Sequence, residues 1–97
     1  MIVHIVMFKF KDENKDKNIK QTKIKLEALV EKIDVLNSIE VGINFTESDR
    51  SFDLSLYSTF NSKDDLKSYA LNPYHLDVVE FIKSVTLESK VVDYISK

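Results

Sequence analysis

The spacing of apolar residues alternates along the chain between a period of two, typical of strands, and a period near 3.6, typical of helices. Residues 2–10 are mostly β-branched or aromatic, and both of their alternating sets are apolar. We therefore expect a strand that is covered on both faces. Residues 39–45 and 52–60 alternate apolar with polar positions and predict two more strands, and a last strand is expected from about 87 to 95.

Helical spacing occupies the stretches between these strands. One amphipathic helix is predicted to follow a polar turn at 11–17 and to end near Asn37, with this apolar stripe: Ile19, Leu26, Leu29, Val30, Ile33 and Leu36. Ser62, followed by Asp65, predicts the N-terminus of the next helix. Asn72-Pro73 should break that helix after an inner stripe of Leu66, Tyr69 and Ala70, and a second stripe predicts a helix beyond the break: Leu76, Val79, Ile82 and Val85.

The predicted order, read as a single domain over residues 1–97, is strand, helix, strand, strand, broken helix, strand. This β-α-β-β-α-β order belongs to the α+β, ferredoxin-like class, an antiparallel four-stranded sheet with helices on one face. The other face would expose Val3, Ile5 and Met7. We expect a homodimer in which two open sheet faces pack together into a barrel-like core; the alternative is that the helices wrap further around a single sheet.

Composition narrows the functional classes. The net charge is −2, and the lysines between Lys9 and Lys25 are interleaved with acidic residues, so we expect no nucleic-acid partner. The absence of cysteine excludes disulfides and thiolate sites, and no cluster of histidine and carboxylate residues has the spacing of a metal site. No apolar run approaches the ~20 residues of a membrane helix, and no signal-peptide pattern precedes the first strand. We therefore expect a cytoplasmic protein without a membrane partner or a metal.

Gly42 and the aromatic residues have mainly structural interpretations. Gly42 is the only glycine and lies in a predicted strand, where glycine usually marks a bulge or the close approach of another backbone. We expect most of the aromatic residues to fill the core rather than to hold a cofactor: Phe8, Phe10, Phe45, Phe52, Phe60, Tyr74 and Phe81.

Candidate chemistry gathers in the segment from Tyr69 to His75. Asn72 is a natural N-cap and Pro73 a natural first helical residue, which places His75 near a helix N-terminus. The helix dipole there disfavours imidazolium and keeps the ring neutral and able to accept a proton. Tyr69 faces inward by helical spacing, and its hydroxyl could bond His75. The structural alternatives are a half-exposed histidine, a core-filling tyrosine and an Asn72 that serves only as a cap.

The chain also resembles a known family over essentially its whole length. The run His4-Ile-Val-Met-Phe-Lys-Phe-Lys11, the strand with Gly42 and the segment Tyr69-x-x-Asn72-Pro73-x-His75 are similar to the stress-responsive A/B barrel (Dabb) domain. The resemblance implies a dimeric α+β barrel. Some plant members are polyketide cyclases, which close a linear chain by an intramolecular aldol step without metal or organic cofactor.

Carried over to this chain, the resemblance implies that His75 is the base, that Tyr69 orients it and that His4 contacts a substrate oxygen. Two positions depart from the cyclases, which have a histidine where Asn72 stands and a pocket tyrosine where Leu26 stands. His4 shares the alternating face of Val6 and Phe8, so it could equally be a buried histidine bonded to a neighbour.

These observations support three functional hypotheses. The first is a cofactor-free enzyme that removes a proton next to a carbonyl group, with Phe8, Leu26, Asn72 and Phe81 lining a pocket for an apolar or aromatic substrate. The second is a dimer that binds a small hydrophobic ligand or serves only as an assembly. The third is a cofactor-free monooxygenase on the same barrel; the absence of tryptophan counts against it.

Overall fold

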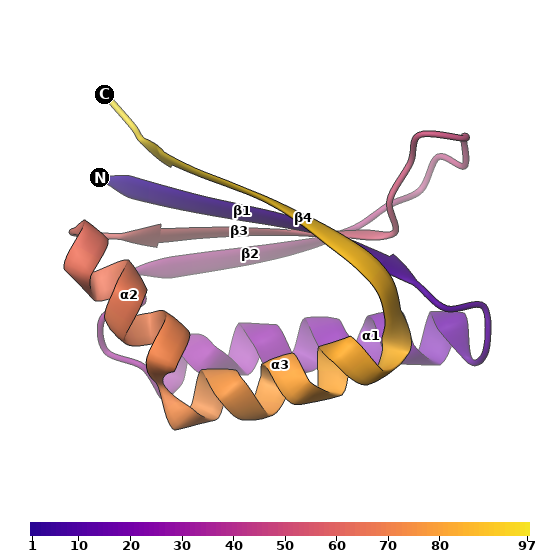
Figure 1. Ribbon diagram of the computed structural model, residues 1–97, viewed down its shortest axis with the longest axis horizontal. Coiled ribbons are helices and arrows are strands. Elements are labelled where there is room, and N and C mark those ends of the chain that lie inside the picture. The colour runs from indigo at the N-terminus through magenta and orange to yellow at the C-terminus, as the bar shows by residue number, and fades with distance from the viewer.

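The sheet has the strand order β2-β3-β1-β4, and every pair of neighbours is antiparallel. The computed structural model describes residues 1–97. Its elements are β1 (Ile2–Phe10), α1 (Lys15–Glu27), η1 (Ala28–Glu31), β2 (Ser38–Ile43), β3 (Leu54–Phe60), α2 (Lys63–Leu71), α3 (Pro73–Val85) and β4 (Thr86–Ile95). Figure 1 shows all the helices on one side of the sheet, which confirms the predicted ferredoxin-like architecture.

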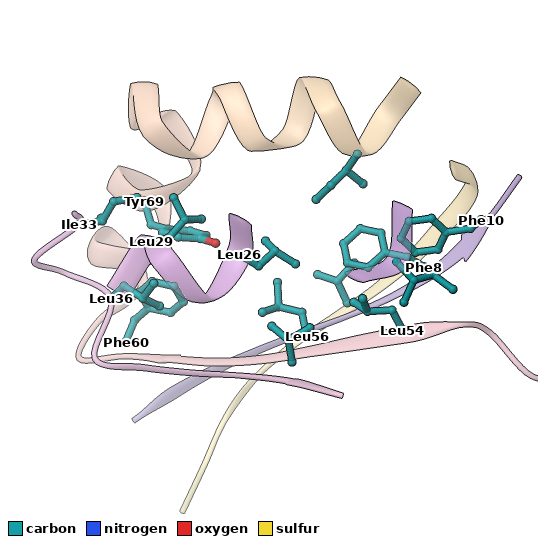
Figure 2. Packing of buried hydrophobic residues seen from close by; sticks show 14 of the residues in the cluster. Phe8, Phe10, Leu26, Leu29, Ile33, Leu36, Leu54, Leu56, Phe60 and Tyr69 are labelled. Atoms are coloured by element: carbon teal, nitrogen blue, oxygen red, sulfur yellow. The ribbon is translucent and has the colours of Figure 1, made fainter. Parts of the chain in front are cut away.

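The core lies between the sheet and the helix layer. It is a cluster of buried side chains from almost every element, and Figure 2 shows most of them: Ile2, Val6, Phe8, Phe10, Ile19, Leu26, Leu29, Ile33, Leu36, Val41, Leu54, Leu56, Phe60, Tyr69 and Ile82. The core-facing side of β1 therefore carries the alternating set that includes Val6 and Phe8. No helix has both the length and the apolar character that a membrane crossing requires.

The opposite side of the sheet is open, and its exposed apolar surface differs from the prediction. Val3 is only 1% exposed and Ile5 is half-buried, because β1 is a central strand and its side chains are flanked by those of β3 and β4. The exposed apolar residues of this face instead lie mostly on the neighbouring strands: Tyr57, Val92 and Tyr94, together with Met7. We call these four residues, with Val3 and Ile5, the open sheet face.

The first helix ends earlier than predicted. Regular α1 stops at Glu27, the short 3₁₀ helix η1 follows, and residues 32–37 turn back toward β2. Ile33 and Leu36 are buried all the same, because the returning chain still presents them to the core. The spacing of Ile33 and Leu36 therefore predicts their burial correctly, but the prediction that they lie in a helix was wrong.

The break between α2 and α3 agrees with the prediction. Ser62 caps α2, with its Oγ accepting a hydrogen bond from the Asp65 N–H at 3.0 Å. Asn72 has an extended backbone and caps α3, whose first residue is Pro73. The inner stripe of α3 differs, however, because Leu76 is 49% exposed, and Tyr74 also faces solvent.

The predictions for Phe45 and Gly42 were wrong. β2 ends at Ile43, and Phe45 lies in the following loop with its side chain 98% exposed. Gly42 sits in a regular ladder with β3, where an added Cβ would meet only the Ser55 Oγ at an ordinary 3.6 Å. The register shift of this sheet lies instead in β1, between Lys9 and Phe10 against β4.

Candidate functional site

A cavity of about 190 Å³ lies between α3 and the core-facing side of the sheet. Both histidines of the chain line it, together with Phe8 and Leu26. The structure therefore brings together four of the residues that the sequence singled out. The remaining lining residues come from β1, β3, α3 and the start of β4: Val6, Leu56, Val79, Ile82, the exposed Lys83, Thr86 and Ser89.

His4 is held in place by the last strand. Asp93 is its direct partner across the β1–β4 ladder, so both side chains project from the same face of the sheet. The His4 Nδ1–H donates a hydrogen bond to the Asp93 carboxylate. Because a carboxylate can only accept, Nδ1 carries the hydrogen and the other ring nitrogen, Nε2, is left for a ligand.

Asp93 was missed in the sequence, although a weak signal was present. It is the acidic residue between Val92 and Tyr94 in an otherwise apolar strand end. Its role depends on the β1–β4 register, which places it opposite His4 and which alternation alone does not reveal.

His75 is positioned by the start of α3. The Asn72 cap and Pro73 set where the helix begins, and the His75 Nδ1–H donates a hydrogen bond to the Ala70 carbonyl oxygen at 3.2 Å. Burial lowers the pKa of His75 below its ordinary value of 6.5. The Ala70 hydrogen bond raises this pKa, and a positive charge on His4 lowers it further. The direction agrees with the helix-dipole argument, but the largest cause is burial.

Tyr69 packs between the two histidines. The centre of its ring lies 4.3 Å from that of His75 and 6.5 Å from that of His4, and it also contacts Phe60, whose ring centre is 5.0 Å away. Its buried hydroxyl has no hydrogen-bond partner, so the expected bond to His75 is absent. Burial raises the pKa of Tyr69 to about 12, which keeps the hydroxyl protonated at neutral pH. In Figure 2 this hydroxyl points toward the part of the core that holds Leu26.

Three of the predicted site residues do not line the cavity: Tyr69, which is buried beside it, and Asn72 and Phe81. The Asn72 Oδ1 accepts a hydrogen bond from the Tyr74 N–H at 2.9 Å, as expected of an N-cap. Phe81 is half-buried at the edge of the core, with the Lys25 ammonium 5.0 Å from its ring centre. Asn72 and Phe81 therefore support the helices around the cavity rather than its interior.

The two imidazoles share one chemical arrangement. Each uses Nδ1 for a structural bond, His4 to Asp93 and His75 to Ala70. Each therefore holds a fixed tautomer when neutral, with the Nε2 lone pair available as a base. A protonated His4 would keep Asp93 as its partner and present an Nε2–H donor. One cavity thus contains a candidate base and a candidate donor.

The family model described as the stress responsive A/B barrel domain (Dabb) matches residues 2–96. The chain belongs to this family. The Dabb domain is 32% identical, over all of its length, to the stress-response A/B barrel domain-containing protein DABB1 of Arabidopsis thaliana, but it spans only 48% of that relative.

Solved structures share the fold of this chain. A dimeric protein of unknown function and ferredoxin-like fold from Bacteroides fragilis is 35% identical, with a TM-score of 0.86 over 96% of this chain and 93% of the other. The hydroxynitrile lyase of Passiflora edulis has a TM-score of 0.88 over 99% of this chain and 93% of the other, at 20% identity. At that identity the likeness concerns the fold alone.

Proposed function

We propose that this Dabb domain catalyses cofactor-free proton transfer on a small apolar or aromatic carbonyl compound, in the manner of the polyketide cyclases it resembles. One observation carries the proposal. The only two histidines of the chain line the same cavity with Nδ1 occupied and Nε2 left for a ligand.

In the proposed reaction the His75 Nε2 takes a proton from the carbon next to the carbonyl group. The lowered pKa of His75 supports this role, because a base that is neutral at physiological pH is ready to accept. The electron pair of the broken C–H bond moves toward the carbonyl oxygen, where negative charge develops. The donor proposed for that oxygen is the Asp93-bound His4 when its Nε2 carries a proton. The unpartnered Tyr69 hydroxyl, buried beside the His75 ring just outside the cavity lining, is proposed as a second donor.

The cavity also limits the substrate. At about 190 Å³ it is smaller than the roughly 300–1,000 Å³ of pockets for drug-sized ligands, so we expect a compact molecule. Phe8, Leu26 and Val79 give it an apolar wall. Lys83 and Ser89 supply polar groups in the same lining.

Exchange of carbon-bound protons in D₂O tests the proposed chemistry without knowledge of the natural substrate. The probe is acetophenone, a compact aromatic ketone, and the readout is the loss of its methyl signal in proton NMR. We expect the protein to accelerate exchange over the same concentration of free imidazole. Replacing His75 by alanine should reduce the protein-dependent rate by about 100-fold or more, because positioned general bases contribute ~10² to 10⁴.

Leu76→Ala is the matched control, since Leu76 is the next residue of α3 and faces solvent. It should leave the exchange rate unchanged. His75→Gln serves as a second variant that keeps a polar side chain of similar length. Exchange by the wild-type protein no faster than by imidazole, or a rate unaffected by both His75 variants, would contradict the proposed chemistry.

A non-catalytic dimer that holds a small ligand is the second candidate. It is favoured by Asn72 and Leu26, which replace polar groups of the plant cyclases, and by the absence of a bond between Tyr69 and His75. The same NMR experiment separates the two functions. Acetophenone signals that broaden on binding, without any exchange, would favour the binding protein.

We further propose that the chain acts as a homodimer through the open sheet face. The relative from Bacteroides fragilis, 35% identical, is described as dimeric. In this chain Val92 is 59% exposed, and Tyr57 and Tyr94 are also exposed on the same face. Two such faces packed together would remove this apolar surface from water, which is the main driving force for association.

A further inference from the structure

The loop between β2 and β3, residues 44–53, carries an aromatic ring that the protomer leaves almost entirely in water. Phe45 is 98% exposed, more than any other large apolar side chain of the chain. The same loop carries Arg50, the only arginine, which is exposed and forms no ion pair within the chain. Aromatic residues and arginine are the types enriched in protein–protein interfaces.

The loop is held in one conformation by its own hydrogen bonds. The Asn44 N–H donates to the Asp53 carbonyl oxygen at 2.9 Å, and the Ser51 hydroxyl donates to the Thr46 carbonyl oxygen at 2.8 Å. The Phe10 N–H donates to the Asp53 carboxylate at 2.7 Å and fastens the base of the loop to β1. Phe45 is therefore presented on a preorganised support, so little ordering would be needed on binding.

The direction of the loop suggests its partner. Figure 1 shows it rising from the end of the sheet on the side opposite the helices, which is the side of the open sheet face. A hollow of about 360 Å³ lies where the loop meets the sheet, and its lining includes Met7 of the open sheet face, Phe45 and Arg50. The exposed ring is thus continuous with the surface proposed to pair two copies.

We propose that residues 44–53 form an arm that clasps a second copy of this chain, with Phe45 buried against the partner's open sheet face. The inference rests on the proposed homodimer and adds one contact to it. Because a two-fold dimer repeats every contact, each protomer contributes one arm and receives one. The arm rises from the end of the sheet and would fix how the two sheets are aligned.

Sedimentation velocity over a concentration series tests the arm with Phe45→Ser. We expect the dissociation constant of the dimer to rise at least about 100-fold. The two-fold dimer would bury two Phe45 rings, and the burial of each apolar ring adds to the free energy of association. The fold should be unchanged by circular dichroism, because Phe45 is almost fully exposed in the protomer. Ile24→Ser is the matched control: Ile24 is also an exposed apolar residue, but it lies on α1 in the helix layer, and its variant should dimerise like the wild type.

A second variant reads the burial of the ring directly. The chain has no tryptophan, so Phe45→Trp introduces a single tryptophan, at the arm, whose emission can be excited apart from that of the four tyrosines. We expect its emission to shift to shorter wavelength as the protein concentration is raised and dimers form. A wild-type dimer whose dissociation constant is unchanged by Phe45→Ser, or a Phe45→Trp dimer with the emission of exposed tryptophan, would overturn the arm and leave the dimer standing. A wild-type monomer at all concentrations would overturn both.

Discussion

At the scale of single residues, Tyr69 shows how a candidate site can oppose stability. Its hydroxyl is buried without a hydrogen-bond partner. An unsatisfied polar group in a core costs about 1–3 kcal/mol relative to its hydrated state. The core would be more stable with phenylalanine at this position. A hydroxyl that is to donate to a developing oxyanion, in contrast, must have no other hydrogen-bond partner before the substrate binds.

Tyr69→Phe should therefore separate stability from activity. We expect the free energy of unfolding in urea to rise by about 1 kcal/mol, because the unpaired hydroxyl is removed and the ring contacts with Phe60 and His75 remain. The acetophenone exchange rate should fall in the same variant. Tyr74→Phe is the control, since that hydroxyl lies on an exposed residue of α3 and its loss should change neither quantity. A destabilised Tyr69→Phe variant would show that the hydroxyl has a stabilising partner.

His75 makes the stability of the protein depend on pH in a predictable direction. Its pKa in the folded protein lies below the ordinary value of 6.5. Between the two values the unfolded chain binds the proton more readily, so the contribution of His75 is complete above pH 6.5 and is lost as the pH falls toward the folded pKa.

The pH dependence has two measurements. We expect the His75 ring signals in NMR to titrate with a midpoint below 6.5, and we expect His75→Gln to lose less stability than the wild type between pH 6.5 and the folded midpoint. His4 and Asp93 are present in both proteins, so the comparison isolates His75. A midpoint at or above 6.5 would contradict the burial argument and weaken the case for His75 as the base.

At the scale of secondary structure, the boundaries that are best predicted from sequence are those set by hydrogen bonds and backbone restrictions within a few residues. The Ser62 cap and the Asn72-Pro73 break each depend on neighbours within a few residues, and both lie where the sequence indicated. The end of α1 depends on where the chain must turn to reach β2, and periodicity contains no signal for that. For this reason the apolar spacing predicts the burial of Ile33 and Leu36 correctly but not their place after the helix has ended.

The site shows the same division between local and long-range information. His75 near a helix start follows from Asn72 and Pro73, and the inward face of His4 follows from alternation in β1. The pair of His4 with Asp93 requires the register between the first and last strands, which residues far apart in the sequence determine together. Phe45 was misjudged because an aromatic residue in an alternating run predicts a strand, and alternation does not reveal that β2 ends at Ile43.

At the scale of the whole molecule, β4 contributes little to the core of a single protomer. Every residue from Leu87 to Ile95 is exposed, although the strand is rich in apolar side chains and forms the edge of the sheet. An exposed apolar edge strand is a liability that proteins usually cover. In the proposed dimer the partner's sheet would cover one face of β4, so much of the stability of this chain should come from association.

The stability of the wild-type protein should therefore depend on its concentration. For a dimer that unfolds to separate chains, each tenfold rise in concentration stabilises the folded state by about 1.4 kcal/mol per dimer. We expect the urea midpoint of unfolding, followed by circular dichroism, to rise across a hundredfold concentration range. Phe45→Ser should have a lower midpoint than the wild type at each concentration at which the wild type is dimeric, because the variant's dimer is weaker. A wild-type midpoint that is independent of concentration would mean that β4 is stable without a partner and that the open sheet face is not an obligatory interface.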